Sequence, residues 1–150
     1  MSFSAKPRRR IDVISFVVSG KPQGKARPRF DSRHKITYTP EKTKSYEALV
    51  RTSYLSQCRL DPPLRGAVKA NIIAYFPIPK SATKAEREKM LEGKVRPMVK
   101  PDMDNIIKAV LDALNGYAYK DDAVVVEVVA EKWYSDTPRV GVILTDGGTQ

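Results

Sequence analysis

The sequence contains one cysteine, Cys58, and one histidine, His34, in 150 residues. A single cysteine excludes an intramolecular disulfide and a cysteine-based zinc site. A Ser-His-Asp mechanism would have to use His34, and no nucleophile motif accompanies that residue. We therefore interpret His34 as a surface or DNA-contact residue and expect no disulfide partner for Cys58.

Long hydrophobic runs and nucleotide-binding glycine patterns are also missing. No run approaches the about 18 apolar residues of a membrane span, and the N-terminus has charge but no apolar signal core. These absences predict a cytoplasmic protein that does not associate with a membrane. The lack of a Walker or Rossmann glycine pattern weighs against a Mg²⁺-dependent phosphotransferase, which an Asp-x-Asp motif could otherwise indicate.

Acidic residues are scarce relative to basic ones. The chain has 27 Lys and Arg against 17 Asp and Glu, a formal net charge of +10. Residues 1–35 hold ten of the basic residues and two acidic ones, so +8 of that charge lies there. Such a concentration favours a nucleic-acid partner. The predicted DNA contacts are Lys21, Lys25, Arg27, Arg29, Arg33 and Lys35.

Two parts of this basic region differ in what they predict. We interpret residues 1–10 as a flexible arm. A solvated tail and a segment that contacts phosphate are about equally supported interpretations of this arm. Alternation places Arg27 and Arg29 on one side of an extended segment, where two guanidinium groups can follow a phosphate backbone.

Length and hydrophobic periodicity predict one domain over residues 1–150, with a frayed tail at residues 146–150. We expect strands over residues 11–19, 35–38, 67–76, 123–134 and 138–144. We expect helices over residues 40–57, 81–91 and 104–115. In the first helix Thr39 is the expected cap, and the expected buried stripe is Tyr46, Leu49, Val50 and Tyr54.

The chemistry of the chain is concentrated between Lys100 and Asp122. At about 100° per residue, the segment from Asp104 forms an amphipathic helix. Its polar arc holds Asp104, Lys108, Asp112 and Asn115, and its apolar arc holds Ile106, Ile107, Val110, Leu111 and Leu114. Asp102 and Asp104 can converge only if Asp102 is extended while Asp104 opens the helix, and Pro101 favours such a break.

A helix stop at Asn115-Gly116 allows the chain to turn back and carry Asp122 toward Asp102 and Asp104. Three close carboxylates repel one another unless a cation neutralises them, and an oxygen ligand set without His or Cys indicates Mg²⁺. The alternative is that these acids only cap the helix in a non-catalytic, basic nucleic-acid-binding protein.

Lys108 lies one helical turn after Asp104 and has two compatible interpretations. It can face the same site and stabilise developing charge. It can also form an i,i+4 ion pair with Asp104 or Asp112, worth about 0.2–0.5 kcal/mol.

The residues Pro101-Asp102-Met103-Asp104-Asn105-Ile106-Ile107-Lys108, followed by Asp112-Ala113-Leu114 and Lys120-Asp121-Asp122, resemble the RusA family of Holliday junction resolvases. The stretch from Lys21-Pro22 to Arg27-Pro28-Arg29-Phe30 is similar to that family's basic N-terminal segment. The resemblance implies a small α/β (α+β) homodimer whose mixed sheet packs against two to three helices. It also implies a bacterial or phage-encoded origin.

The activity implied by the resemblance is a Mg²⁺-dependent endonuclease that resolves four-way DNA junctions by paired nicks, in recombination and repair. Asp102, Asp104 and Asp122 match the family's catalytic, metal-binding carboxylates, and Lys108 matches its functional lysine. Asp121 matches a neighbouring acidic position of lesser weight, which makes it a further candidate metal ligand.

Overall fold

The computed structural model describes residues 12–147, so the predicted arm at residues 1–10 lies outside the described residues. The elements in chain order are β1 (Asp12–Ser19), β2 (Arg29–Asp31), β3 (Ile36–Tyr38), α1 (Glu41–Gln57), β4 (Val68–Pro77), α2 (Lys84–Leu91), α3 (Met103–Ala113), the 3₁₀ turn η1 (Asp122–Val124), β5 (Val125–Ser135) and β6 (Arg139–Asp146). None of the described helices is long and apolar enough to cross a membrane.

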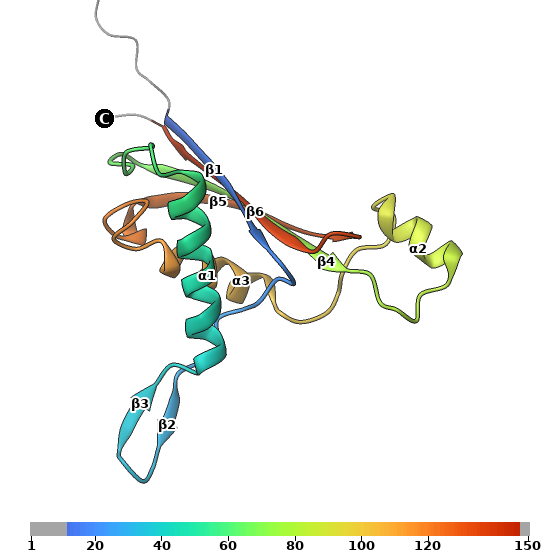
Figure 1. Ribbon diagram of the computed structural model, residues 1–150, viewed down its shortest axis with the longest axis horizontal. Coiled ribbons are helices and arrows are strands. Elements are labelled where there is room, and N and C mark those ends of the chain that lie inside the picture. Colours follow the sequence, from blue (N-terminus) through green and yellow to red (C-terminus); the bar gives the residue numbers. More distant parts are fainter. Residues whose placement is uncertain (1–11, 148–150) are drawn as a thin grey trace, which may run out of the picture.

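Four strands form one mixed sheet in the order β1-β6-β4-β5 (Figure 1). Strand β6 is antiparallel to both β1 and β4, whereas β4 and β5 are parallel. A parallel pair needs a long crossover, and the segment that carries α2 and α3 supplies it. The predicted α+β fold, with a mixed sheet and two to three helices, is therefore confirmed, with three helices present.

The core lies between one face of the sheet and the helices α1 and α3. Strand β4 alternates buried and half-buried residues along its whole length, as expected for a strand with one packed face. Its buried residues meet Tyr46 and Val50 of α1 and Ile106 and Val110 of α3 within one core cluster. Helix α2 has no buried residues and extends away from this core (Figure 1).

The two edges of the sheet differ in their protection. At the β1 edge, the Gln57 side chain accepts from the Val17 N–H at 2.8 Å and donates to the Val17 carbonyl at 2.7 Å. The thiol of Cys58 donates to the Ser15 carbonyl at 3.4 Å. Both edge strands carry exposed valines, Val13 of β1 at 56% and Val126 of β5 at 70%. An uncovered apolar edge can pair with another chain.

The structure corrects two details of the first predicted helix. Leu49 is 43% exposed, because the buried stripe is centred on Tyr46, Val50 and Tyr54 and is completed by the small residues Thr43 and Ser53. Thr39 is not the cap: Pro40 holds that position without a side-chain hydrogen bond.

Three element boundaries also differ from prediction. Helix α2 begins at Lys84 because the Thr83 hydroxyl caps it, accepting from the Glu86 N–H at 3.2 Å. Strand β6 extends to Asp146, which accepts from the N–H groups of Arg65 and Gly66 and so does not belong to a frayed tail. Residues 29–31 form β2, which pairs with β3 as a hairpin.

Candidate active site

Helix α3 presents its polar face outward because its apolar face is buried. Ile106, Val110 and Leu114 are fully buried, whereas Asp104 and Lys108 are exposed. Asp102 directly precedes the helix with φ −67° and ψ 154°, so its backbone is extended, as the sequence predicted. Its side chain makes no capping hydrogen bond. The capping interpretation therefore does not explain Asp102.

Asp102 is instead neutralised by a lysine. The Lys100 ammonium donates to Asp102 Oδ2 at 2.7 Å. The segment that holds both residues is fixed from β5, where Lys132 Nζ donates to the carbonyls of Val99 at 2.6 Å and Pro101 at 3.1 Å. Burial lowers the pKa of Lys132, and the charge of Asp102 opposes that effect.

The second group of carboxylates lies at the other end of α3. Asp122 opens η1 after the chain has turned back, and its carboxyl interacts with those of Asp112 and Asp121. Burial first, and then the charges of Asp112 and Asp121, raise the pKa of Asp122. The sequence predicted that Asp122 would come toward Asp102 and Asp104, whereas the carboxyls that influence it in the structure are those of Asp112 and Asp121.

Asp102, Asp104 and Asp122 are not assembled into a ready metal site. Within residues 12–147, no group of three Asp, Glu, His or Cys residues is arranged to hold a metal ion. The donor types suit Mg²⁺, because all are carboxylate oxygens. The arrangement of the three carboxylates does not suit Mg²⁺, since they would have to come closer together to bind one ion.

Lys25 lies beside this second group and comes from the loop between β1 and β2. Its ammonium donates to Asp112 Oδ2 at 2.7 Å and lies 3.3 Å from Glu47 Oε1. The hydrogen bond to Asp112 is the largest cause of the raised pKa of Lys25. Lys25 was predicted as a DNA contact, and the structure places it in an internal ion pair. Glu47 was missed because nothing in its local sequence marks it.

The loop that carries Lys25 is held closely against both helices. Its backbone donates from Lys25 N–H to the Asn105 carbonyl at 3.0 Å and from Ala26 N–H to the Thr43 hydroxyl at 3.2 Å. A Cβ at Gly24 would lie 2.9 Å from the Cβ atoms of both Asn105 and Pro101. Only glycine allows so close an approach to the start of α3.

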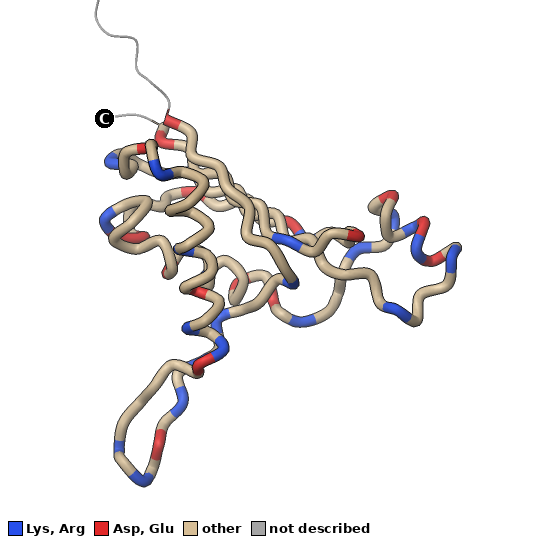
Figure 2. The backbone as a smooth tube through the Cα atoms, in the orientation of Figure 1, with Lys and Arg blue, Asp and Glu red and all other residues tan. Residues whose placement is uncertain are grey.

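The other predicted DNA contacts are exposed and near the hairpin. Figure 2 shows basic residues along the β2–β3 hairpin, which projects away from the body of the protein. Arg29 lies in β2, and Arg33 and Lys35 lie in its turn region, where His34 contacts Asp31 at 2.7 Å. No carboxylate within residues 12–147 forms an ion pair with Lys21, Arg27 or these three residues.

Comparison with known proteins shows a family and a relative that this chain resembles. A family model described as "Endodeoxyribonuclease RusA" matches residues 19–145, which include the whole acidic stretch. The uncharacterized protein YqaN of Bacillus subtilis (strain 168) is 39% identical over 143 residues, which cover 91% of this chain and 98% of that protein.

Gly24→Ala should destabilise the protein by about 1–3 kcal/mol, the usual range for an overpacked site. The added methyl group would meet Asn105 and Pro101 at 2.9 Å. Urea unfolding measures the effect. Gly141→Ala is the control, because the nearest atom to its new Cβ is the Ile73 carbonyl oxygen at 4.0 Å. Equal destabilisation by both substitutions would contradict the close packing of the loop.

Asp122→Asn should raise the melting temperature at neutral pH in EDTA. The folded-state pKa of Asp122 lies above its ordinary value of 3.8. The folded protein therefore binds more protons than the unfolded chain between these two values, and stability falls as the pH rises through that window. Asparagine cannot ionise, so the variant avoids this loss of stability. The difference in melting temperature between Asp122→Asn and the wild type should therefore disappear below pH 3.8.

The control for this measurement is Asp61→Asn, which removes an exposed carboxylate outside the acidic group. It should leave the melting temperature unchanged over the same pH range. A melting temperature for Asp122→Asn at or below that of the wild type at neutral pH would show that the Asp122 charge is not under repulsion.

Proposed function

This chain belongs to the RusA family of endodeoxyribonucleases, and from that premise we propose that it is a Mg²⁺-dependent enzyme that resolves four-way DNA junctions by paired symmetric nicks. The observation that carries the proposal is that carboxylates lie at both ends of α3, Asp102 before the helix and Asp122 next to Asp112, in a chain with exposed lysines and arginines on the loop and hairpin before α1. The activity would serve DNA recombination and repair.

Asp102, Asp104 and Asp122 are the proposed metal ligands, with Asp121 as an additional candidate. Lysine ammonium groups lie 2.7 Å from Asp102 and from the neighbouring Asp112, which supports a cation as the partner of this face. A Mg²⁺ ion, when bound, would lower the pKa of a water and neutralise phosphate oxygens. The three ligands must approach one another more closely than they do in the structure for this ion to bind.

Lys108 is the proposed electrostatic partner of the phosphate. It is exposed on the same face of α3 as Asp104. Asp112 pairs with Lys25, and Lys108 makes no ion pair with any described carboxylate, so the expected i,i+4 pair is absent among residues 12–147. An unpaired ammonium at this position can stabilise the charge that develops on the attacked phosphate.

A non-catalytic DNA-binding protein is the second candidate. The observation that favours it is that Lys25 and Lys100 neutralise two of the carboxylates without a metal ion. The two candidates are separated by incubating labelled four-way junction, duplex and single strand with the protein, with and without Mg²⁺. Cleavage of the junction only with Mg²⁺ supports the nuclease, and binding without any cleavage supports the alternative.

Asp122→Asn should abolish junction cleavage and leave junction binding intact or tighter. The substitution removes a charge that would hold the metal ion, and it also removes a charge that repels the phosphate in the absence of metal. Gel-based cleavage and fluorescence anisotropy measure the two effects. Asp61→Asn should change neither. Wild-type cleavage by Asp122→Asn would remove Asp122 from the proposed ligand set.

We further propose a homodimer in which two copies pair through the uncovered edge of β5. Two symmetric nicks require two active sites related by a two-fold axis, which an isologous dimer supplies. Gln57 bonds the Val17 backbone groups at the β1 edge, and Arg96 donates to the Lys132 carbonyl in the second half of β5, so the first half of β5 is the stretch we propose for pairing. Val126 and Val129 are 70% and 42% exposed there, which is typical of a surface that another chain covers.

The double substitution Val126→Lys with Val129→Lys should convert this dimer to a monomer, because lysines on an edge strand oppose pairing. Sedimentation velocity at micromolar concentration measures the change. Val13→Lys is the control, since Val13 is 56% exposed but lies on the β1 strand. A wild-type monomer that is fully active on junctions would contradict the homodimer, and a lysine variant that stays dimeric would contradict the β5 interface.

A further inference from the structure

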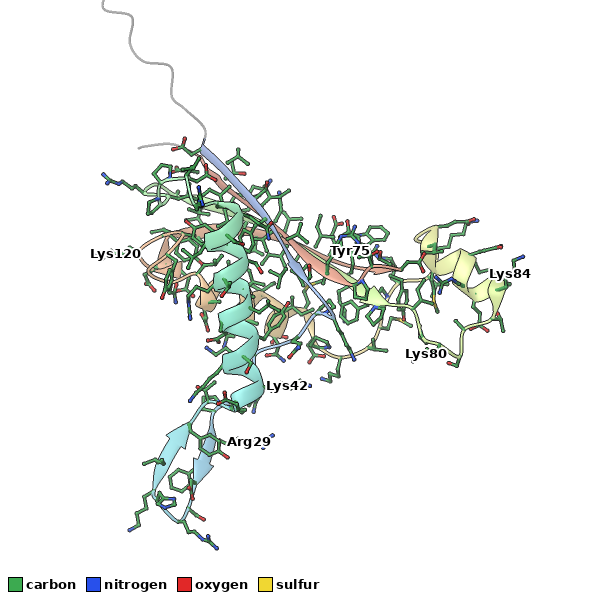
Figure 3. All side chains as sticks on the ribbon, viewed as in Figure 1. Arg29, Lys42, Tyr75, Lys80, Lys84 and Lys120 are labelled. Carbon is green, nitrogen blue, oxygen red and sulfur yellow. The ribbon has the colours of Figure 1, made fainter. Side chains whose placement is uncertain are left out.

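A cavity of about 370 Å³ lies where four segments meet. These are the loop after β1, the base of the β2–β3 hairpin, the start of α1 and the residues before Asp102. Its volume is within the about 300–1,000 Å³ that small-ligand sites occupy. Figure 3 labels Arg29 and Lys42 at the place where the hairpin joins α1, and both side chains line the cavity.

The lining of this cavity is cationic. Lys21, Arg29, Lys42 and Lys100 contribute to it, and no Asp or Glu does. Only Lys100 has a carboxylate partner within residues 12–147. Like charges gathered around one space repel one another, and an anion in that space relieves the repulsion. The expected ligand is therefore negatively charged.

Neutral donors complete the site. Thr43 lines the cavity, and its hydroxyl accepts from the Ala26 N–H at 3.2 Å. A hydroxyl that accepts one hydrogen bond still has its own hydrogen to donate. Gln23 adds a side-chain amide to the lining. A phosphate group, with several acceptor oxygens and a full charge, matches lysine, arginine and hydroxyl donors of this kind.

Lys100 connects the cavity to the proposed active site. It lines the cavity, and its ammonium lies 2.7 Å from Asp102 Oδ2. An anion held here would therefore lie next to the carboxylate proposed to act on the scissile phosphate. We propose that the cavity binds a backbone phosphate of the cut strand, adjacent to the phosphate that is hydrolysed. This inference rests on the proposed nuclease function.

Lys42→Ala tests the proposal against the matched control Lys44→Ala. Both lysines are exposed on the first turns of α1, and only Lys42 lines the cavity. Binding of a four-way junction is measured by fluorescence anisotropy in EDTA over a series of salt concentrations. Lys42→Ala should weaken binding roughly tenfold, the effect of one lost charged hydrogen bond. The slope of log affinity against log salt should become less negative by about 0.9, the contribution of one phosphate.

Lys44→Ala should leave affinity and slope close to the wild-type values. Equal losses for Lys42→Ala and Lys44→Ala would overturn the proposal. Lys21→Ala serves as a second variant, with the same expected loss as Lys42→Ala. Because all three side chains are exposed, thermal unfolding should show that each variant is folded.

A scan of the DNA with single methylphosphonates identifies the phosphate. Removing the charge of one phosphate near the branch point should weaken wild-type binding and have no further effect on Lys42→Ala, because the two changes remove the same contact. The absence of any such coupled position would overturn the proposal. Free thymidine 5′-monophosphate is the second probe: Lys42-dependent binding of it without a coupled position would assign the cavity to a nucleotide and overturn the strand assignment.

The outcomes also separate this inference from the proposed function. A coupled phosphate in a protein that does not cut junctions in Mg²⁺ would support the cavity and contradict the nuclease. Junction cleavage by the wild type, together with equal affinity of Lys42→Ala and Lys44→Ala, would support the nuclease and contradict the cavity.

Discussion

Burial of the apolar face of α3 is the constraint on which the rest of the site depends. Ile106, Val110 and Leu114 are fully buried against the sheet and α1, so the helix cannot rotate without exposing them. Full burial of such a side chain is worth about 1.5–3 kcal/mol. The opposite face, with Asp104 and Lys108, must therefore point outward. The tightly packed loop at Gly24 and the turn at Asp122 then meet α3 at fixed positions.

Electrostatic balance along α3 follows from this placement. In a chain with net charge +10, five of the 17 acidic residues lie on α3 or the segments beside it, and a lysine neutralises one of them at each end of the helix. Lys100 forms the ion pair with Asp102, and Lys25 forms the ion pair with Asp112. A divalent ion at this face has to compete with ammonium groups that are already in place.

Local pattern predicted α3 and the extended backbone at Asp102, because both follow from short-range periodicity and from a proline before a helix. It could not predict the partner of Lys25, since Asp112 lies 87 residues away in sequence and the contact depends on how the loop packs. Lys132 was missed for the same reason: its role comes from carbonyl groups 31 and 33 residues earlier. Leu49 was misplaced because small polar residues, Thr43 and Ser53, fill the buried stripe instead.

The position of β5 connects the proposed dimer interface to the proposed active site. The strand begins one residue after η1, the turn that Asp122 opens, and Lys132 on the same strand holds the segment before Asp102. Pairing of two copies through β5 would therefore set the separation of their two acidic faces by strand register alone. Register is a discrete quantity, because a slip of one residue turns every side chain to the other face of the sheet. A junction cut at two symmetric positions needs a fixed separation of this kind, and a dimer joined through flexible loops could not maintain it.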